Sequence, residues 1–83
     1  MGRVFARWRE ELVWEAGAER LVFEFTMGVP TIYFPTRERW AQLSATRSLS
    51  YDDALADVSA WAERERVPLR VEDDAWGHRA APD

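Results

Sequence analysis

The chain contains no cysteine, no lysine and no run of more than three consecutive apolar residues. Without cysteine it forms neither disulfides nor thiolate metal sites, a composition typical of a reducing cytoplasm. Apolar runs this short exclude a membrane-spanning helix, and the charged residues after Met1 lack the apolar segment of a signal peptide. We therefore expect a soluble, cytoplasmic protein.

The eleven basic residues are all arginine, and fifteen acidic residues give the chain a net charge of −4. A complete lack of lysine is what a GC-rich, bacterial genome would produce. None of the three segments 1–34, 35–66 and 67–83 carries a basic excess, and proteins that bind nucleic acid through its phosphates need a basic face. We therefore expect no nucleic-acid partner.

Tryptophan, in contrast, is abundant, with five residues in a chain of 83 that has room for one domain. An indole buries about 150–250 Å² in a core, so the tryptophans decide how much core this chain can build. They lie at Trp8, Trp14, Trp40, Trp61 and Trp76. We expect Trp40 and Trp61 inside the fold, whereas Trp14 and Trp76 are equally compatible with an exposed contact surface.

Alternating apolar and polar residues predict a three-stranded antiparallel meander over residues 11–34. Every second side chain in residues 21–27 is large and apolar, and Gly28-Val29-Pro30 separates this segment from a second alternating run at 31–34. Such a turn is typical of a hairpin. A further strand at 12–15 leads into the hairpin through a segment that contains glycine.

Residues 3–9 fit two structures. Val4, Ala6 and Trp8 alternate as in a strand, whereas Val4, Phe5 and Trp8 also share one side of a helix. The compact apolar run at 12–14 favours a strand, so we place a strand here and keep the helix as the alternative.

The period changes to that of helices after Pro35. Thr36 can cap a helix over residues 37–47. Ser50, with an aspartate three positions later, predicts the start of a second helix over residues 51–65.

The second helix presents Leu55, Val58 and Trp61 at helical spacing, and we expect this stripe to pack on the sheet. Pro68 ends the helix, and residues 67–71 alternate as a final strand. Proline at the start of a strand predicts an edge position.

The remaining residues, 73–83, read as an acidic C-terminal tail, which leaves a single domain over residues 1–72. The expected fold class is α+β: an antiparallel sheet of three to five strands, with two helices packed on one face.

No motif for catalysis or cofactor binding is present. The nearest approach to a metal site combines Glu72, Asp73 and Asp74 with the single histidine, His78, but no calcium-binding pattern or second histidine supports it. Nucleophilic catalysis would need His78 beside a serine, and none of the serines lies in a Gly-x-Ser-x-Gly motif. We therefore expect no enzyme activity, no cofactor and no metal.

The candidate contact residues for a partner or ligand are Trp14, Val22, Tyr33, Arg37 and Trp76. Tryptophan, tyrosine and arginine dominate binding hot spots, and a strand that is apolar on both faces needs a cover that a second subunit can supply. The sequence thus predicts a small acidic accessory protein, of the inhibitor or immunity type, that binds another protein or forms a homodimer through its N-terminal half. The alternative is a small-molecule binding protein with a tryptophan-lined pocket between sheet and helices.

Overall fold

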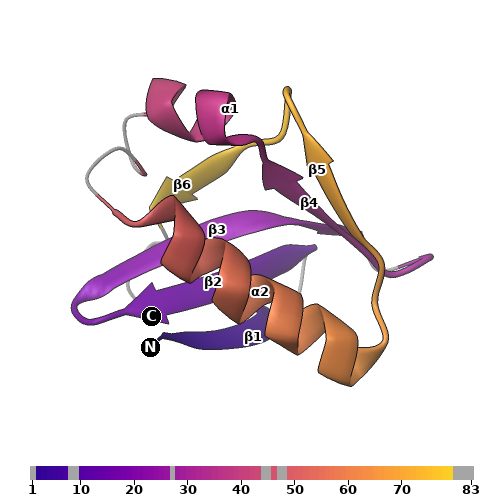
Figure 1. Ribbon diagram of the computed structural model, residues 1–83. Helices are drawn as coiled ribbons and strands as arrows, with labels where there is room; N and C mark the ends of the chain where they lie inside the picture. Colours follow the sequence, from indigo (N-terminus) through magenta and orange to yellow (C-terminus); the bar gives the residue numbers. More distant parts are fainter. Residues whose placement is uncertain (1, 8–9, 27, 44–45, 47–48, 80–83) are drawn as a thin grey trace.

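The computed structural model describes residues 2–7, 10–26, 28–43, 46 and 49–79. The fold is α+β, an open six-stranded sheet that is mostly antiparallel, with two helices (Figure 1). The strands are β1 (Arg3–Arg7), β2 (Glu11–Ala16), β3 (Glu19–Thr26), β4 (Thr31–Pro35), β5 (Leu69–Glu72) and β6 (Gly77–Arg79). The helices are α1 (Arg37–Gln42) and α2 (Tyr51–Glu65). The class is the one that the sequence predicts, with one strand more than the expected maximum.

Strands β2, β3 and β4 form an antiparallel meander at the predicted place, residues 11–34. A two-residue turn joins β2 to β3, and its first residue, Gly17, has a φ of 61°, which glycine adopts without steric cost. Strand β1 pairs antiparallel with β2, so residues 3–7 are a strand and not the alternative helix. Residues 8 and 9 of that segment lie outside the described residues.

The neighbouring strands β4 and β5 are parallel, which corrects the expectation of a wholly antiparallel sheet. Both helices lie in the connection between them, and parallel neighbours need a crossover of this length. The Thr36 hydroxyl accepts a hydrogen bond from the Arg39 amide at 3.2 Å and caps α1 as predicted. Ser50 caps α2 in the same way, accepting from the Asp53 amide at 3.1 Å. Helix α1 is shorter than predicted, because Leu43 already has an extended backbone.

Side chains from one face of the sheet and from both helices form the core. It consists of Leu12, Trp14, Leu21, Phe23, Phe25, Ile32, Phe34, Trp40, Tyr51, Ala54, Val58 and Ala62. The buried side of α2 runs through Tyr51, Ala54, Val58 and Ala62, so of the predicted stripe only Val58 is fully buried. Leu55 and Trp61 are only partly buried, and Trp61 meets Phe25 edge-on with ring centroids 5.8 Å apart. Alanine has no bulk beyond Cβ, which lets the helix lie close to the sheet.

The predicted acidic tail contributes the sixth strand. Strand β6 pairs antiparallel with the first half of β3, opposite residues 21–23. Because β2 occupies the other edge of β3, β6 and β4 follow each other along the same edge. The sheet thus includes residues 77–79 of the segment predicted as a tail, while residues 80–83 lie outside the described part of the chain.

Candidate interaction surface

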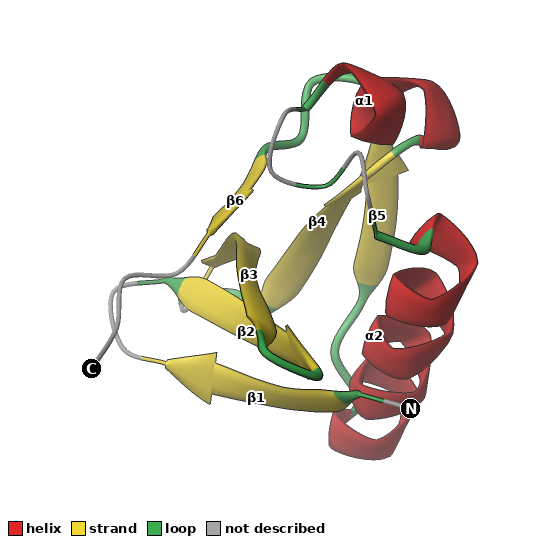
Figure 2. Cartoon of the chain, turned by 90° about the vertical axis from the view of Figure 1, so that its left-hand side faces the viewer, coloured by secondary structure: helices red, strands yellow, loops and turns green. Residues whose placement is uncertain are grey.

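The face of the sheet that points away from the core is called the outer face below. Figure 2 shows α2 along the opposite side of the sheet. Successive side chains of a strand point to opposite faces, so the residues between the core positions belong to the outer face. They include Arg3, Phe5, Arg7, Glu11, Val13, Glu15, Arg20, Val22, Glu24, Tyr33, Arg70, Glu72 and His78.

An apolar strip crosses the middle of the outer face. The pairing register places four side chains in one row: Phe5, Val13, Val22 and His78. Val13 and Val22 are fully buried, although neither belongs to the main core. Trp76 stacks on His78, with ring centroids 4.9 Å apart and an interplanar angle of 25°. The tryptophan therefore lies at one end of the strip.

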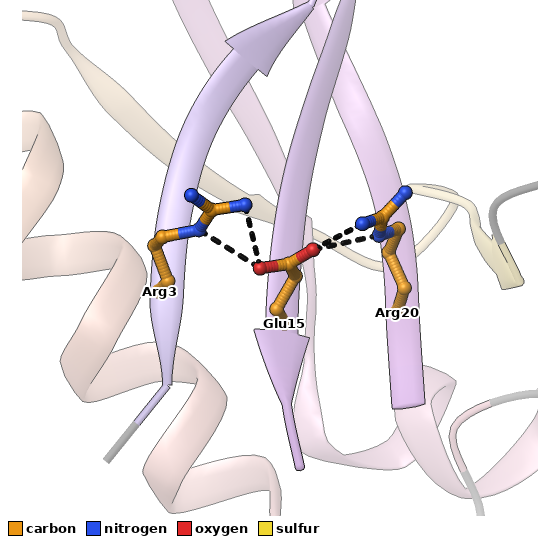
Figure 3. A network of polar contacts seen from close by, with 3 residues as sticks. All are labelled: Arg3, Glu15 and Arg20. Atoms are coloured by element: carbon orange, nitrogen blue, oxygen red, sulfur yellow. Dashed lines mark hydrogen bonds and ion pairs between the residues drawn. The ribbon is translucent and has the colours of Figure 1, made fainter. Parts of the chain in front are cut away.

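A charged row borders the strip on one side, where Glu15 lies between two arginines of the neighbouring strands (Figure 3). Arg3 Nε donates to Glu15 Oε1 at 2.8 Å, and Arg20 Nε donates to Oε2 at 2.8 Å. These hydrogen bonds lower the pKa of Glu15 below its ordinary value, against the opposing effect of burial. The Arg3 guanidinium also lies over the Phe5 ring, 4.6 Å from its centroid.

A second polar row borders the strip on its other side. It runs through Arg7, Glu11, Glu24, Tyr33 and Arg70. Arg7 Nε donates to Glu11 Oε1 at 2.9 Å, and the Arg7 side chain is only 21% exposed. Long charged side chains cover apolar surface with their aliphatic stems. Val13 and Val22, which have no exposed surface, thus lie between two polar rows.

The outer face is electrically balanced, unlike the chain as a whole. Its described residues include four arginines and three glutamates, and Glu72, which accepts from Arg70 Nε at 2.9 Å, adds a fourth carboxylate. The net charge of −4 therefore comes from the rest of the chain. The exposed side of α2 and the segment between β5 and β6 both carry acidic residues.

Three of the five candidate contact residues share the outer face. Val22 lies in the apolar strip, Tyr33 in the second polar row, and Trp76 on the ring of His78. Tyr33 and Trp76 are half-buried, but Val22 has no exposed surface. Val22 therefore packs within this face and presents no exposed atoms to a partner.

The other two candidates, Trp14 and Arg37, do not lie on the outer face. Trp14 belongs to the core, where it is 2% exposed and its Nε1 donates to Asp57 Oδ2 of α2 at 2.8 Å. Arg37 links the two helices, because it lies over the Tyr51 ring and pairs with Asp52 at 2.6 Å. The sequence predicts an interface in the N-terminal half. Trp14 and Val22 are both buried within the chain, so neither offers exposed apolar surface to such an interface.

Sequence reasoning missed the Glu15 network and the position of His78. The charges at both ends of residues 3–7 and 11–15 hinted at cross-strand pairs. Which charge meets which depends on the register, and a shift of one residue would turn every pair to the other face.

Two depressions lie outside the apolar strip of the outer face. One, of about 220 Å³, is lined by Gly2, Trp14, Ala16, Gly17, Leu49, Ser50 and Asp53. The other, of about 560 Å³, is open and is lined by Thr36, Val71, Glu72, Asp73 and Asp74. Neither encloses a ring of aromatic side chains.

Within the described part of the chain, no three histidine or acidic residues come close enough to hold a metal ion. None of its helices has both the length and the apolar character needed to cross a membrane. Comparisons with models of known protein families, with curated proteins and with solved structures gave no match for this chain.

Proposed function

We propose that the chain is a non-catalytic protein-binding module that contacts another protein through its outer face. The proposal rests on one observation: arginine and aromatic side chains lie together on the outer face, in and beside the apolar strip. The residues concerned are Arg3, Phe5, Tyr33, Arg70, Trp76 and His78. Tryptophan, tyrosine and arginine are the residue types enriched in interface hot spots. The exposed side of α2 has none of these aromatic residues and carries mainly acidic residues and alanine.

The ion pairs of the outer face hold its arginine side chains in one conformation before a partner binds. Glu15 holds Arg3 against the ring of Phe5, and yet the Arg3 side chain is 68% exposed. A side chain that is already held in one conformation loses less entropy when a partner binds. A guanidinium that keeps exposed N–H groups can also form a two-point contact with a carboxylate of the partner.

A protein partner with both charges on its surface suits this face best, because the face itself is balanced. An accessory role of the inhibitor or immunity type fits the small size and acidic charge of the chain, by analogy alone. A cytoplasmic setting fits the absence of cysteine.

The test is isolation of a partner, followed by binding measurements with purified components. The wild-type chain is compared with Trp76→Ala and Arg3→Ala. Val29→Ala is the matched control, since Val29 is 79% exposed in the turn between β3 and β4. We expect the purified partner to bind wild type and control equally, and the Kd to rise about thirtyfold in each face variant, the loss of one hot-spot residue. A partner that binds both face variants as well as wild type, or no partner of defined stoichiometry, contradicts the proposal.

Small-molecule binding is the second candidate, and the depression of about 220 Å³ beside Trp14 favours it. Ligand pockets usually enclose about 300–1,000 Å³, so only a small ligand would fit. The Trp14 fluorescence offers a direct assay in a screen of small metabolites. Saturable quenching that disappears in Leu49→Trp, which fills the depression, would favour this function over the first.

A further inference from the structure

Strand β5 is the last strand of the sheet beyond β4, and no other described strand pairs with its outer edge. It lies at the right of Figure 1, next to β4. An edge of this kind presents unpaired backbone groups that can pair with a strand of another chain. The strand also carries Val71, which is 48% exposed and is, with Val29, one of two large apolar residues exposed among those described.

Two hydrogen bonds define which backbone groups of β5 point outward. The Ile32 amide donates to the Pro68 carbonyl at 2.9 Å, and the Thr36 amide donates to the Glu72 carbonyl at 3.3 Å. Backbone groups of successive residues in a strand point in opposite directions within the sheet. The residues of even number in β5 therefore bond to β4, and Leu69 and Val71 direct their N–H and C=O groups to the open edge.

The side chains that flank Val71 have opposite charges. Arg70 and Glu72 lie on the same face of the strand, 2.9 Å apart at Arg70 Nε and Glu72 Oε2. The edge is thus a short alternation of positive charge, exposed valine and negative charge. When two such edges lie antiparallel, the positive residue of one copy is therefore opposite the negative residue of the other.

We propose that two copies of this chain associate through their β5 edges, antiparallel and about a two-fold axis at Val71. Val71 then faces Val71 of the partner subunit, and their outward backbone groups form two hydrogen bonds. Arg70 faces Glu72 of the partner subunit, and Glu72 faces Arg70 of the partner subunit. Opposite charges directly across two strands stabilise the pairing, and a two-fold axis makes every contact occur twice.

No neighbouring register meets these conditions. A shift that centres the axis on Arg70 still uses the outward backbone groups of Leu69 and Val71, but it opposes two arginines and moves each Val71 away from its counterpart. A shift of one residue along the partner places Arg70 against Val71 of the partner subunit and leaves both charges without an opposite. Only the register centred on Val71 joins the outward backbone, the exposed apolar side chain and the two charge pairs.

This association shares only Arg70 with the residues of the proposed function, and it leaves Arg3, Phe5 and Trp76 of each copy accessible to a partner. It joins the two outer faces at their β5 edges into one longer surface. A strand of four residues buries little area, which places the contact in the weak class of interfaces. The dimer should therefore form only as the protein concentration rises.

The first experiment is sedimentation equilibrium over a wide concentration range. Wild type should rise from the 9.7 kDa of one chain toward twice that mass. Val71→Pro removes an outward N–H group without touching the bonds to β4, as proline does on an edge strand, and it should raise the dimer dissociation constant at least tenfold. Val29→Ser, at the other exposed valine, should leave it unchanged. Circular dichroism checks that Val71→Pro remains folded, and Val71→Ser takes its place if it does not.

A charge exchange tests the register. Arg70→Glu places like charges opposite each other in its own homodimer, and so does Glu72→Arg, so each variant alone should associate at least fivefold more weakly than wild type. A mixture of the two restores both opposite pairs between subunits, though neither chain has a complementary pair of its own. The mixture should therefore form heterodimers at wild-type strength.

Three results would overturn the proposal. They are a wild-type mass that stays at one chain into the millimolar range, a dimer that persists unchanged in Val71→Pro, and a mixture of the two charge variants that stays monomeric. The first or second result leaves the outer face intact as a protein-binding surface, because the variants of the proposed function lie at other residues.

Discussion

Asp57 ties the first strand of the sheet to helix α2, and its removal should be one of the most costly polar substitutions in this chain. Its Oδ2 accepts hydrogen bonds from Trp14 Nε1 and from the Gly2 amide, both at 2.8 Å. The structure has no space for a replacement at Gly2, where a Cβ would lie 2.3 Å from the Glu15 carbonyl oxygen. Asp57→Ala would leave both donors without their acceptor.

The expected cost follows from the burial of the two donors. A hydrogen bond to a charged group contributes about 1.5–3 kcal/mol, and an unpaired buried donor costs about 1–3 kcal/mol. Trp14 is almost fully buried, whereas Gly2 is half-buried and can turn to water. Asp57→Ala should therefore lower the free energy of unfolding by about 2–4 kcal/mol, a large part of the about 4–12 kcal/mol available to a chain of this length.

Urea unfolding followed by far-ultraviolet circular dichroism measures this cost without relying on tryptophan fluorescence. Trp14→Phe keeps an aromatic ring but removes the donor, so the double variant with Asp57→Ala should lose about 1–2 kcal/mol less than the sum of the two single losses. Glu63→Gln, on the exposed side of α2, is the control and should stay within about 0.5 kcal/mol of wild type. A cost below about 0.5 kcal/mol for Asp57→Ala, or losses that simply add, would refute the reasoning.

Four further outcomes are expected. The stabilisation from the lowered pKa of Glu15 is complete above its ordinary value of 4.5 and is lost as the pH falls through the folded value, so Glu15→Gln should flatten the acid side of the stability profile in urea titrations. Burial raises the pKa of Tyr51, with the charge of Arg37 opposing it; stability should fall as the pH rises above 10.0, and Tyr51→Phe should abolish this alkaline loss. Arg66 ends α2 with a left-handed φ of 58°, and Arg66→Gly should raise the free energy of unfolding by about 1 kcal/mol in the same assay. DNA and RNA should migrate unretarded with the protein at low salt, because the chain is acidic and the outer face is balanced; salt-sensitive retardation at micromolar protein would contradict this.

The parts of the fold that depend on local sequence could be predicted. Alternation over residues 21–27 and the caps at Thr36 and Ser50 involve residues within a few positions of one another. Each of these signals acts before any distant contact forms. The meander and both helix starts are therefore at the predicted places.

The parts that depend on distant pairing could not. Strand β6 has three residues, which is too short to show a period, and only its pairing with β3 makes it a strand. The apolar run at 12–14 has large side chains on both faces, so alternation alone cannot say which face Trp14 occupies. Trp14 Nε1 donates the hydrogen bond that accounts for its position to Asp57, 43 positions away in the chain.

The outer face contributes to the stability of the sheet and, in the proposed function, to partner binding. A single substitution can affect both. The ion pairs of its arginines join neighbouring strands, while the exposed ends of these side chains are the proposed contacts. Arg3→Ala therefore removes the ion pair with Glu15 and the proposed contact together, so a loss of binding alone does not separate a loosened strand from a lost contact. Arg3→Lys keeps the charge and most of the stem but loses the planar fork of the guanidinium. If the outer face binds through this fork, the lysine variant should bind more weakly at nearly unchanged stability, and that separation assigns the effect to contact and not to folding.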